Sequence, residues 1–225
     1  GQLPHSVDDI PESAEGSGHE LPAAKIVKAS CRVSFLGKIL FGNLAAVRLQ
    51  HLHRGRLDRS KGPDAAARVF AYALEGVNAV APSRLTTASV YEVNNMRSRR
   101  VYTENPVAYP TGNFKRMDRN SYFEIVIEGL KPFSSTTIEE IATVFFDWEK
   151  IQSLGFESNM NLPAISNGQV IGTMNLLNVK GHFTPDRVAA ALEWQPIVTL
   201  AFMQLQAKGG ETASLHLEGQ EPQGP

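Results

Sequence analysis

The chain has 225 residues, 42% of them hydrophobic, and a formal net charge of −1, a composition typical of a globular protein rather than of a polyelectrolyte. Its single cysteine, Cys31, excludes an internal disulfide framework and a multi-cysteine zinc site and fits a reducing compartment. No apolar run approaches the ~18–20 residues of a membrane span, and the first residues lack the order of a signal peptide. We therefore expect a cytoplasmic protein with one domain and substantial tails, or with two small domains.

The first 63 residues form an N-terminal extension of changing charge. Residues 1–20 carry five acidic residues and no Lys or Arg, which predicts disorder. Residues 21–63 carry nine Lys/Arg against Asp58 alone. Within them, 33–56 has a rough helical spacing of apolar residues, which indicates either an amphipathic helix for anionic lipid or nucleic acid, or a helix that packs on the next domain. Two interrupting glycines favour the second interpretation, so no nucleic-acid partner is expected.

Residues 64–207 have the pattern of a compact domain, followed by a flexible Gly/Pro/Glu-rich tail over 208–225. A first helix is predicted over 63–80, where Pro63 and Asp64 stand at its start. Two antiparallel strands are predicted next, over 85–93 and 98–110, from their β-branched and aromatic residues and from the prolines that end the second.

Two helices are predicted in the middle of the domain. The first covers 121–130, and the second runs from a capping Thr136 or Thr137 to Gly155. A hairpin follows, and a last helix of more than 20 residues starts at Thr184-Pro185-Asp186, with a kink expected at Pro196. This order of elements predicts an α+β fold with a largely antiparallel sheet.

The predicted hairpin, Ser158–Asn178, is the most patterned stretch of the chain. Two apolar runs flank the turn signal Ser166-Asn167-Gly168. Because side chains alternate along a strand, a register that places Asn161 near Asn175 would give one sheet face a polar cluster in apolar surroundings. Such amides need partners, which are either a ligand or the backbone of segment 130–155.

Two segments resemble parts of GAF domains. WEKIQSLGFESNMNLPAISNGQVIGTMNLLNVKGHFTPDRVAA (148–190) resembles the C-terminal half of a GAF domain in its Leu154-Gly155 turn, its NLPAI and GQVIGTMNLL strands and its capped helix. NSYFEIVIEGLKPFSSTTIEEIATVFFD (120–147) resembles the middle segment of small, stand-alone bacterial GAF-domain proteins. The resemblance covers about 65–207, whereas 1–63 matches no family.

The resemblance implies a central antiparallel sheet with the first and last helices on one face. On the other face, the middle helices and loops would cover a small-molecule pocket. For each aromatic candidate for its walls, plain core packing is the favoured alternative. The residues expected to bind the ligand are Tyr91, Tyr102, Tyr122, Phe123, Asn159, Asn161, Thr173 and Asn175.

Several functions are disfavoured by missing motifs. The sequence has no G-x-S-x-G, phosphate loop, H-E-x-x-H or Cys-x-x-Cys. The catalytic GAF branch, free methionine sulfoxide reductase, uses several cysteines, and phytochromes attach bilins through a domain cysteine, whereas Cys31 lies outside the domain. The Asn-Lys-Phe-Asp-Glu set of cyclic-nucleotide GAF domains is not found. We expect a non-catalytic, small-molecule-binding sensory or regulatory domain without a metal site; the alternative is an interaction or dimerisation module with a collapsed pocket.

The last predicted helix is apolar nearly all round, so it is either deeply buried or shared with a partner. In the resembling family the first and last helices commonly form a two-fold seam, which implies a homodimer. The kink at Pro196 would confine the contact to part of the helix. Alternatively, residues 21–63 cover this surface within one chain.

Overall fold

The structure is a computed structural model that describes residues 61–62, 64–209 and 212–217. The predictions for the acidic and basic N-terminal segments, Cys31 and Pro63 fall outside the described residues, as does that for most of the C-terminal tail.

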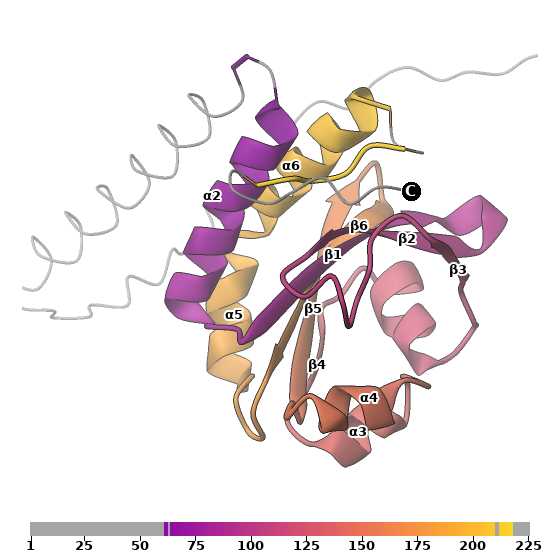
Figure 1. The fold of residues 1–225 in the computed structure, drawn as a ribbon, viewed down its shortest axis with the longest axis vertical. Coiled ribbons are helices and arrows are strands. Elements are labelled where there is room, and N and C mark those ends of the chain that lie inside the picture. The colour runs from indigo at the N-terminus through magenta and orange to yellow at the C-terminus, as the bar shows by residue number, and fades with distance from the viewer. Residues whose placement is uncertain (1–60, 63, 210–211, 218–225) are drawn as a thin grey trace, which may run out of the picture. The chain divides into compact units, whose positions relative to one another are not determined.

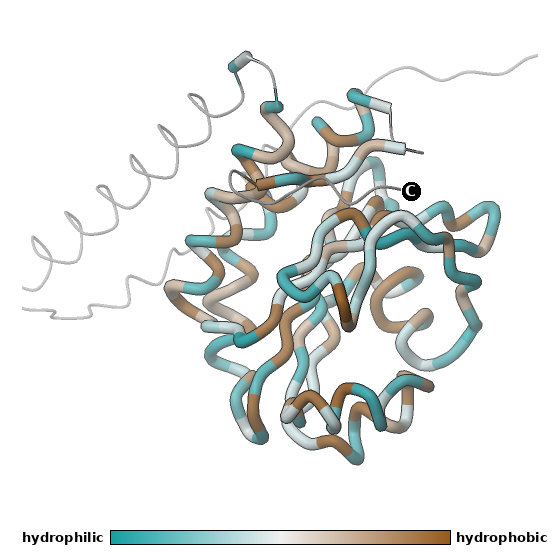
Figure 2. Tube along the Cα trace, in the orientation of Figure 1, coloured by the Kyte–Doolittle hydropathy of each residue, from teal (hydrophilic) through white to brown (hydrophobic). Residues whose placement is uncertain are grey.

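One six-stranded antiparallel sheet, in the order β3-β2-β1-β6-β5-β4, organises the domain. Hydrophobic and hydrophilic residues are mixed along its strands (Figure 2), as expected when the two faces meet different surroundings. The strands are β1 (Leu85–Glu92), β2 (Arg97–Thr103), β3 (Phe114–Arg116), β4 (Phe133–Ser135), β5 (Ser158–Ser166) and β6 (Gln169–Asn178). The predicted α+β fold is confirmed; the short edge strands β3 and β4 were not predicted, because three residues are too few to show a period of two.

Helices cover both faces of the sheet (Figure 1). One face carries α2 (Ala65–Val80), α5 (Pro185–Leu192) and α6 (Gln195–Ala207). The other face carries the π-helix η2 (Phe123–Glu128), α3 (Ile138–Ala142) and α4 (Trp148–Ser153); these three helices are called the roof below. The arrangement matches the one that the resemblance implied.

The roof differs in detail from its predicted helices. A helix is present within the expected range 121–130, but it has π geometry from Phe123 to Glu128; for example, the N–H of Gly129 bonds the carbonyl of Glu124 at 2.8 Å. The next helix is capped by Thr137, whose hydroxyl accepts a hydrogen bond from the N–H of Glu140 at 3.3 Å.

The single helix predicted up to Gly155 is instead two short helices, α3 and α4, separated at 143–147. In the break, the ring of Phe145 packs against those of Tyr122 and Phe133, with centroid distances of 5.1 and 5.8 Å. The aromatic contacts of Phe145 therefore stabilise a break at 143–147 more than a continuous helix would be stabilised by its own hydrogen bonds. Gly155, with φ of 82°, ends α4 in the left-handed conformation, as predicted.

The last helix is broken rather than kinked. α5 ends at Leu192, α6 begins at Gln195, and the two axes differ by 54°. Pro196 stands in the first turn of α6, where its missing N–H removes no helical hydrogen bond. Within the described part of the chain, no single helix is long and apolar enough to span a membrane; α5 and α6 pass that test only as this bent pair.

The main core lies between the sheet and the helices α2 and α6. Fully buried side chains from both layers, such as Phe70, Leu162 and Phe202, fill it. The described tail residues contribute too: Leu215 is 1% exposed and its N–H bonds the carbonyl of Val101 at 2.8 Å. Part of the segment expected to be a flexible tail thus packs along β2.

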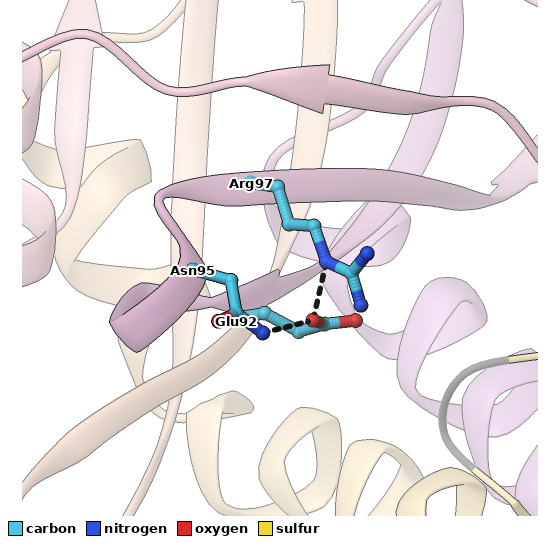
Figure 3. Close-up of polar contacts among 3 residues, drawn as sticks. All are labelled: Glu92, Asn95 and Arg97. Atoms are coloured by element: carbon cyan, nitrogen blue, oxygen red, sulfur yellow. Dashed lines mark hydrogen bonds and ion pairs between the residues drawn. The ribbon is translucent and has the colours of Figure 1, made fainter.

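A polar cluster closes the turn between β1 and β2. The carboxylate of Glu92 accepts hydrogen bonds from Nδ2 of Asn95 at 3.1 Å and Nε of Arg97 at 2.5 Å (Figure 3). The bonds from Arg97 and Asn95 hold the pKa of Glu92 below its usual value. The guanidinium of Arg97 also lies 4.1 Å from the ring centroid of Phe114, so the turn holds the edge strand β3 in place.

Gly76 permits the close approach of α2 and the α5–α6 junction. A Cβ at this position would come within 2.2 Å of the indole of Trp194. Alanine is intrinsically better than glycine in a helix by about 1 kcal/mol, but overpacking costs about 1–3 kcal/mol. We expect Gly76→Ala to lower the free energy of unfolding by about 1–2 kcal/mol, measured by urea denaturation. In a Trp194→Leu background the same change should be neutral or stabilising; equal losses in both backgrounds would contradict this contact.

Candidate functional site

The hairpin of β5 and β6 places two asparagines face to face beneath the roof. Its turn residues Asn167 and Gly168 have φ of 50° and 70°, as a type I′ turn requires. A register shift between Ala164 and Ile165 then pairs Asn161 with Asn175, and both side chains line a cavity on the roof side. Met160, between Asn159 and Asn161 in the chain, is fully buried on the opposite face, as the alternation predicts.

The amides form a continuous row of hydrogen bonds across four strands. The hydroxyl of Ser135 in β4 donates to Oδ1 of Asn159. Nδ2 of Asn159 donates to Oδ1 of Asn161 at 2.8 Å, Nδ2 of Asn161 to Oδ1 of Asn175 at 2.7 Å, and Nδ2 of Asn175 to Oγ1 of Thr87 at 3.3 Å. We call these five residues the amide row. The amides thus partner mainly one another, which neither sequence-based alternative anticipated.

A second set of polar groups, three hydroxyls, lies beside the amide row. The hydroxyl of Tyr91 is 3.0 Å from that of Tyr122 and 3.1 Å from Oγ1 of Thr173. Burial raises the pKa of Tyr91 and of Tyr122, so both phenols stay protonated near neutral pH. The expected site residue Thr173 therefore supports Tyr91 and does not itself line the cavity.

The cavity between sheet and roof has a volume of about 220 Å³. Its floor is formed by Thr87, Asn159, Asn161 and Asn175 of the amide row. Its apolar walls include Ile127 of the roof and also Val144 and Phe145, which lie between α3 and α4. Few convergent polar groups in an apolar concavity are typical of a ligand site. Of the residues expected from the sequence, those at the cavity are Tyr91, Tyr122, Phe123, Asn159, Asn161 and Asn175.

The expected position of Tyr102 is corrected by the structure. Its ring is 2% exposed on the opposite face of the sheet, 4.9 Å from the ring of Phe70. The cause is a β-bulge: Ala88 pairs with Tyr102 but the next residue, Ser89, pairs with Arg100. The extra residue between them reverses the alternation, so Tyr102 enters the core and Arg100 enters the cavity.

Sequence reasoning missed the charged end of the cavity. Arg100 and Lys115 line it, and both also line an adjoining cavity of about 250 Å³ that extends to Lys150. Nη1 of Arg100 donates to the carbonyl of Pro110 at 3.1 Å. The basic run Arg97–Arg100 was the available signal, but the pairing of β2 with β3 that brings Lys115 beside it cannot be read from a local pattern.

The described residues hold no group of three His, Cys, Asp or Glu side chains that could bind a metal ion. The cavity offers hydrogen bonding, with the amides and the hydroxyls of Tyr91 and Tyr122 at one end. The other end holds cations, the hydroxyl of Tyr109 and the carboxylate of Asp147.

No protein-family model matches the sequence, and no curated protein matches it. The fold does match solved structures. The GAF domain of a phosphoenolpyruvate-protein phosphotransferase from Coxiella burnetii matches with a TM-score of 0.53 at 14% identity, over 72% of this chain and 96% of that one. The GAF domain of a two-component sensor histidine kinase from Bacillus halodurans gives 0.52 at 8% identity, over 63% and 95%. The chromophore-binding domain of a bacteriophytochrome from R. palustris gives 0.50 at 8% identity, over 73% and 62%.

Removing the middle of the amide row tests its contribution to stability. Asn161→Leu keeps the side-chain size but leaves Nδ2 of Asn159 and Oδ1 of Asn175 without their partners. An orphaned buried polar group costs about 1–3 kcal/mol, so we expect a loss of that order in the free energy of unfolding, measured in urea. The exposed Asn94 provides the control Asn94→Leu, for which little change is expected. Equal losses for the two variants would show that the row does not stabilise the fold.

Proposed function

The described domain has the GAF fold, and on that premise we propose that it is a non-catalytic sensory or regulatory domain that binds a small molecule under its roof. The observation that carries the proposal is the amide row on the floor of the cavity (Asn161 and Asn175 at 2.7 Å). The proposed ligand-contacting residues are those that line the cavity. The proposal specifies no particular ligand or cofactor.

The amide row retains hydrogen-bonding capacity after its own bonds are made. A carboxamide has two N–H donors and two acceptor lone pairs. Asn161 uses one donor toward Asn175 and one acceptor toward Asn159, so one of each remains. A floor made only to hold strands together would need no such surplus, whereas a polar ligand needs both kinds of partner at fixed positions.

Two features favour binding over the alternative of a pure interaction module. A collapsed pocket would leave no cavity, yet about 220 Å³ remain between sheet and roof. Two of the matched solved structures are a GAF domain of a sensor histidine kinase and a chromophore-binding domain. Catalysis is not part of the proposal, because the sequence offers the 64–207 domain no cysteine nucleophile. We also propose that the protein is cytoplasmic.

The binding proposal is tested with the full chain purified without denaturation. We expect native mass spectrometry to show a mass offset from a retained molecule, or ligand-observed NMR to find binders in a fragment library. Ser98 lines the cavity and Ser134 is exposed on β4, so Ser98→Phe should abolish binding by filling the cavity and Ser134→Phe should not. The proposal fails if the wild type retains nothing and binds no fragment, or if Ser98→Phe binds normally.

We further propose that the protein is a homodimer whose contact includes the outer side of α6. Five apolar residues of α6 are buried within the chain, but Met203 remains 47% exposed. The alternative, a cover formed by residues 21–63, concerns residues outside the described part of the chain.

Light scattering after size exclusion tests the dimer on the full chain. We expect a dimeric mass for the wild type and a monomeric mass for Met203→Glu, because a buried charge opposes association. The matched control is Ile125→Glu, which changes an exposed apolar residue on the roof and should leave the dimer intact. A monomeric wild type at micromolar concentration would end the dimer proposal.

A further inference from the structure

We propose that the ligand presents an anionic group, a carboxylate or a phosphate, to a site formed by Arg100, Lys115 and Lys150. This inference rests on the proposed function and names the class of molecule that the cavity takes. The observations that support the anionic group come from the end of the cavity opposite to the amide row.

The three cations gather where two cavities meet. Both cavities are lined by Ser89, Ser98, Arg100, Tyr109 and Lys115. The first continues to the amide row, and the second continues to Lys150. A small molecule with its body over the amides can therefore direct one end toward the cations.

Arg100 and Tyr109 hold polar atoms that this protein itself does not satisfy. Nε of Arg100 and the hydroxyl of Tyr109 are buried without a hydrogen-bond partner. The guanidinium lies 4.9 Å from the ring centroid of Tyr109, and Nζ of Lys150 lies 4.6 Å from it. Native proteins rarely leave such groups unpaired, and an oxyanion between them would accept both N–H and O–H.

The charges around the junction leave a positive excess. Four cations line the two cavities, and they face only two carboxylates, Asp118 and Asp147. Asp118 pairs with Arg116 at 3.5 Å. Among the described residues, no carboxylate forms an ion pair with Arg100, Lys115 or Lys150, although Nζ of Lys150 donates to the carbonyl of Ala108. The geometry leaves these cations available to a ligand.

The pKa shifts agree with this placement. Burial lowers the pKa of Arg100, so this guanidinium lacks part of its hydration. Burial and the Asp147 carboxylate raise the pKa of Tyr109 to about 12, which keeps its hydroxyl a donor. The planar fork of arginine suits carboxylate and phosphate alike.

The test compares anions with neutral molecules of the same shape. Binding of benzoate, benzamide and phenyl phosphate to the full chain is measured by ligand-observed NMR in a phosphate-free buffer. We expect benzoate or phenyl phosphate to bind more tightly than benzamide, and the tighter of the two identifies the anion. A charge-assisted hydrogen bond contributes about 1.5–3 kcal/mol, so Arg100→Gln should weaken anion binding about 10- to 100-fold and weaken the binding of neutral benzamide by less.

Two further variants keep the test decisive. Lys115 and Lys131 are both exposed, so Lys115→Gln should fold normally even if Arg100→Gln does not, and should also weaken anion binding. Lys131→Gln, outside both cavities, should have no effect. If benzamide binds as well as benzoate and Ser98→Phe abolishes both, the anion inference is overturned and the binding proposal stands. If the anions do not bind at millimolar concentration, or if Lys131→Gln weakens them as much as Lys115→Gln, the inference is likewise overturned.

Discussion

The register of one hairpin decides both the core and the pocket of this protein. Asn167 and Gly168 close β5 on β6 with two residues at positive φ, and a register shift between Ala164 and Ile165 then places Asn161 opposite Asn175. A slip of one residue would move every side chain of a strand to the other face. It would then expose Met160 to the cavity and bury the amides against α2 and α6, so packing of the core and chemistry of the floor depend on the same constraint.

β2 contributes a second departure from regular alternation, in addition to the register shift between β5 and β6. The bulge at Val101 lets Val101 and Tyr102 both enter the core while Arg100 reaches the cavity. The site is thereby divided, with neutral amides under the centre of the roof and cations toward β3. Each half depends on an irregularity: the register shift between β5 and β6 aligns Asn161 with Asn175, and the bulge in β2 turns Arg100 to the cavity.

What could be predicted from the sequence follows from this division. The turn signal and the period of two along β5 predicted a hairpin with Asn159 and Asn161 on one face, but the register shift between Ala164 and Ile165 that brings Asn161 opposite Asn175 has no local sequence signal. Tyr102 was misplaced because a bulge leaves no mark on a local pattern. Lys115 and the break at 143–147 depend on contacts between distant segments, including the ring packing of Phe145 on Tyr122, and tertiary packing of this kind overrides local propensity.

The amide row has a consequence for how the pocket responds to an occupant. Each side chain of the row donates a hydrogen bond to the next, in one direction from Ser135 to Thr87. One reversed amide would set two donors or two acceptors against each other, so the amides can reverse only together, with the terminal hydroxyls exchanging the roles of donor and acceptor. The hydrogen bonds of the floor therefore all run in the same direction. A ligand that prefers one orientation of the Asn161 amide also selects the orientation of the other amides and hydroxyls of the row, in all four strands that the row crosses.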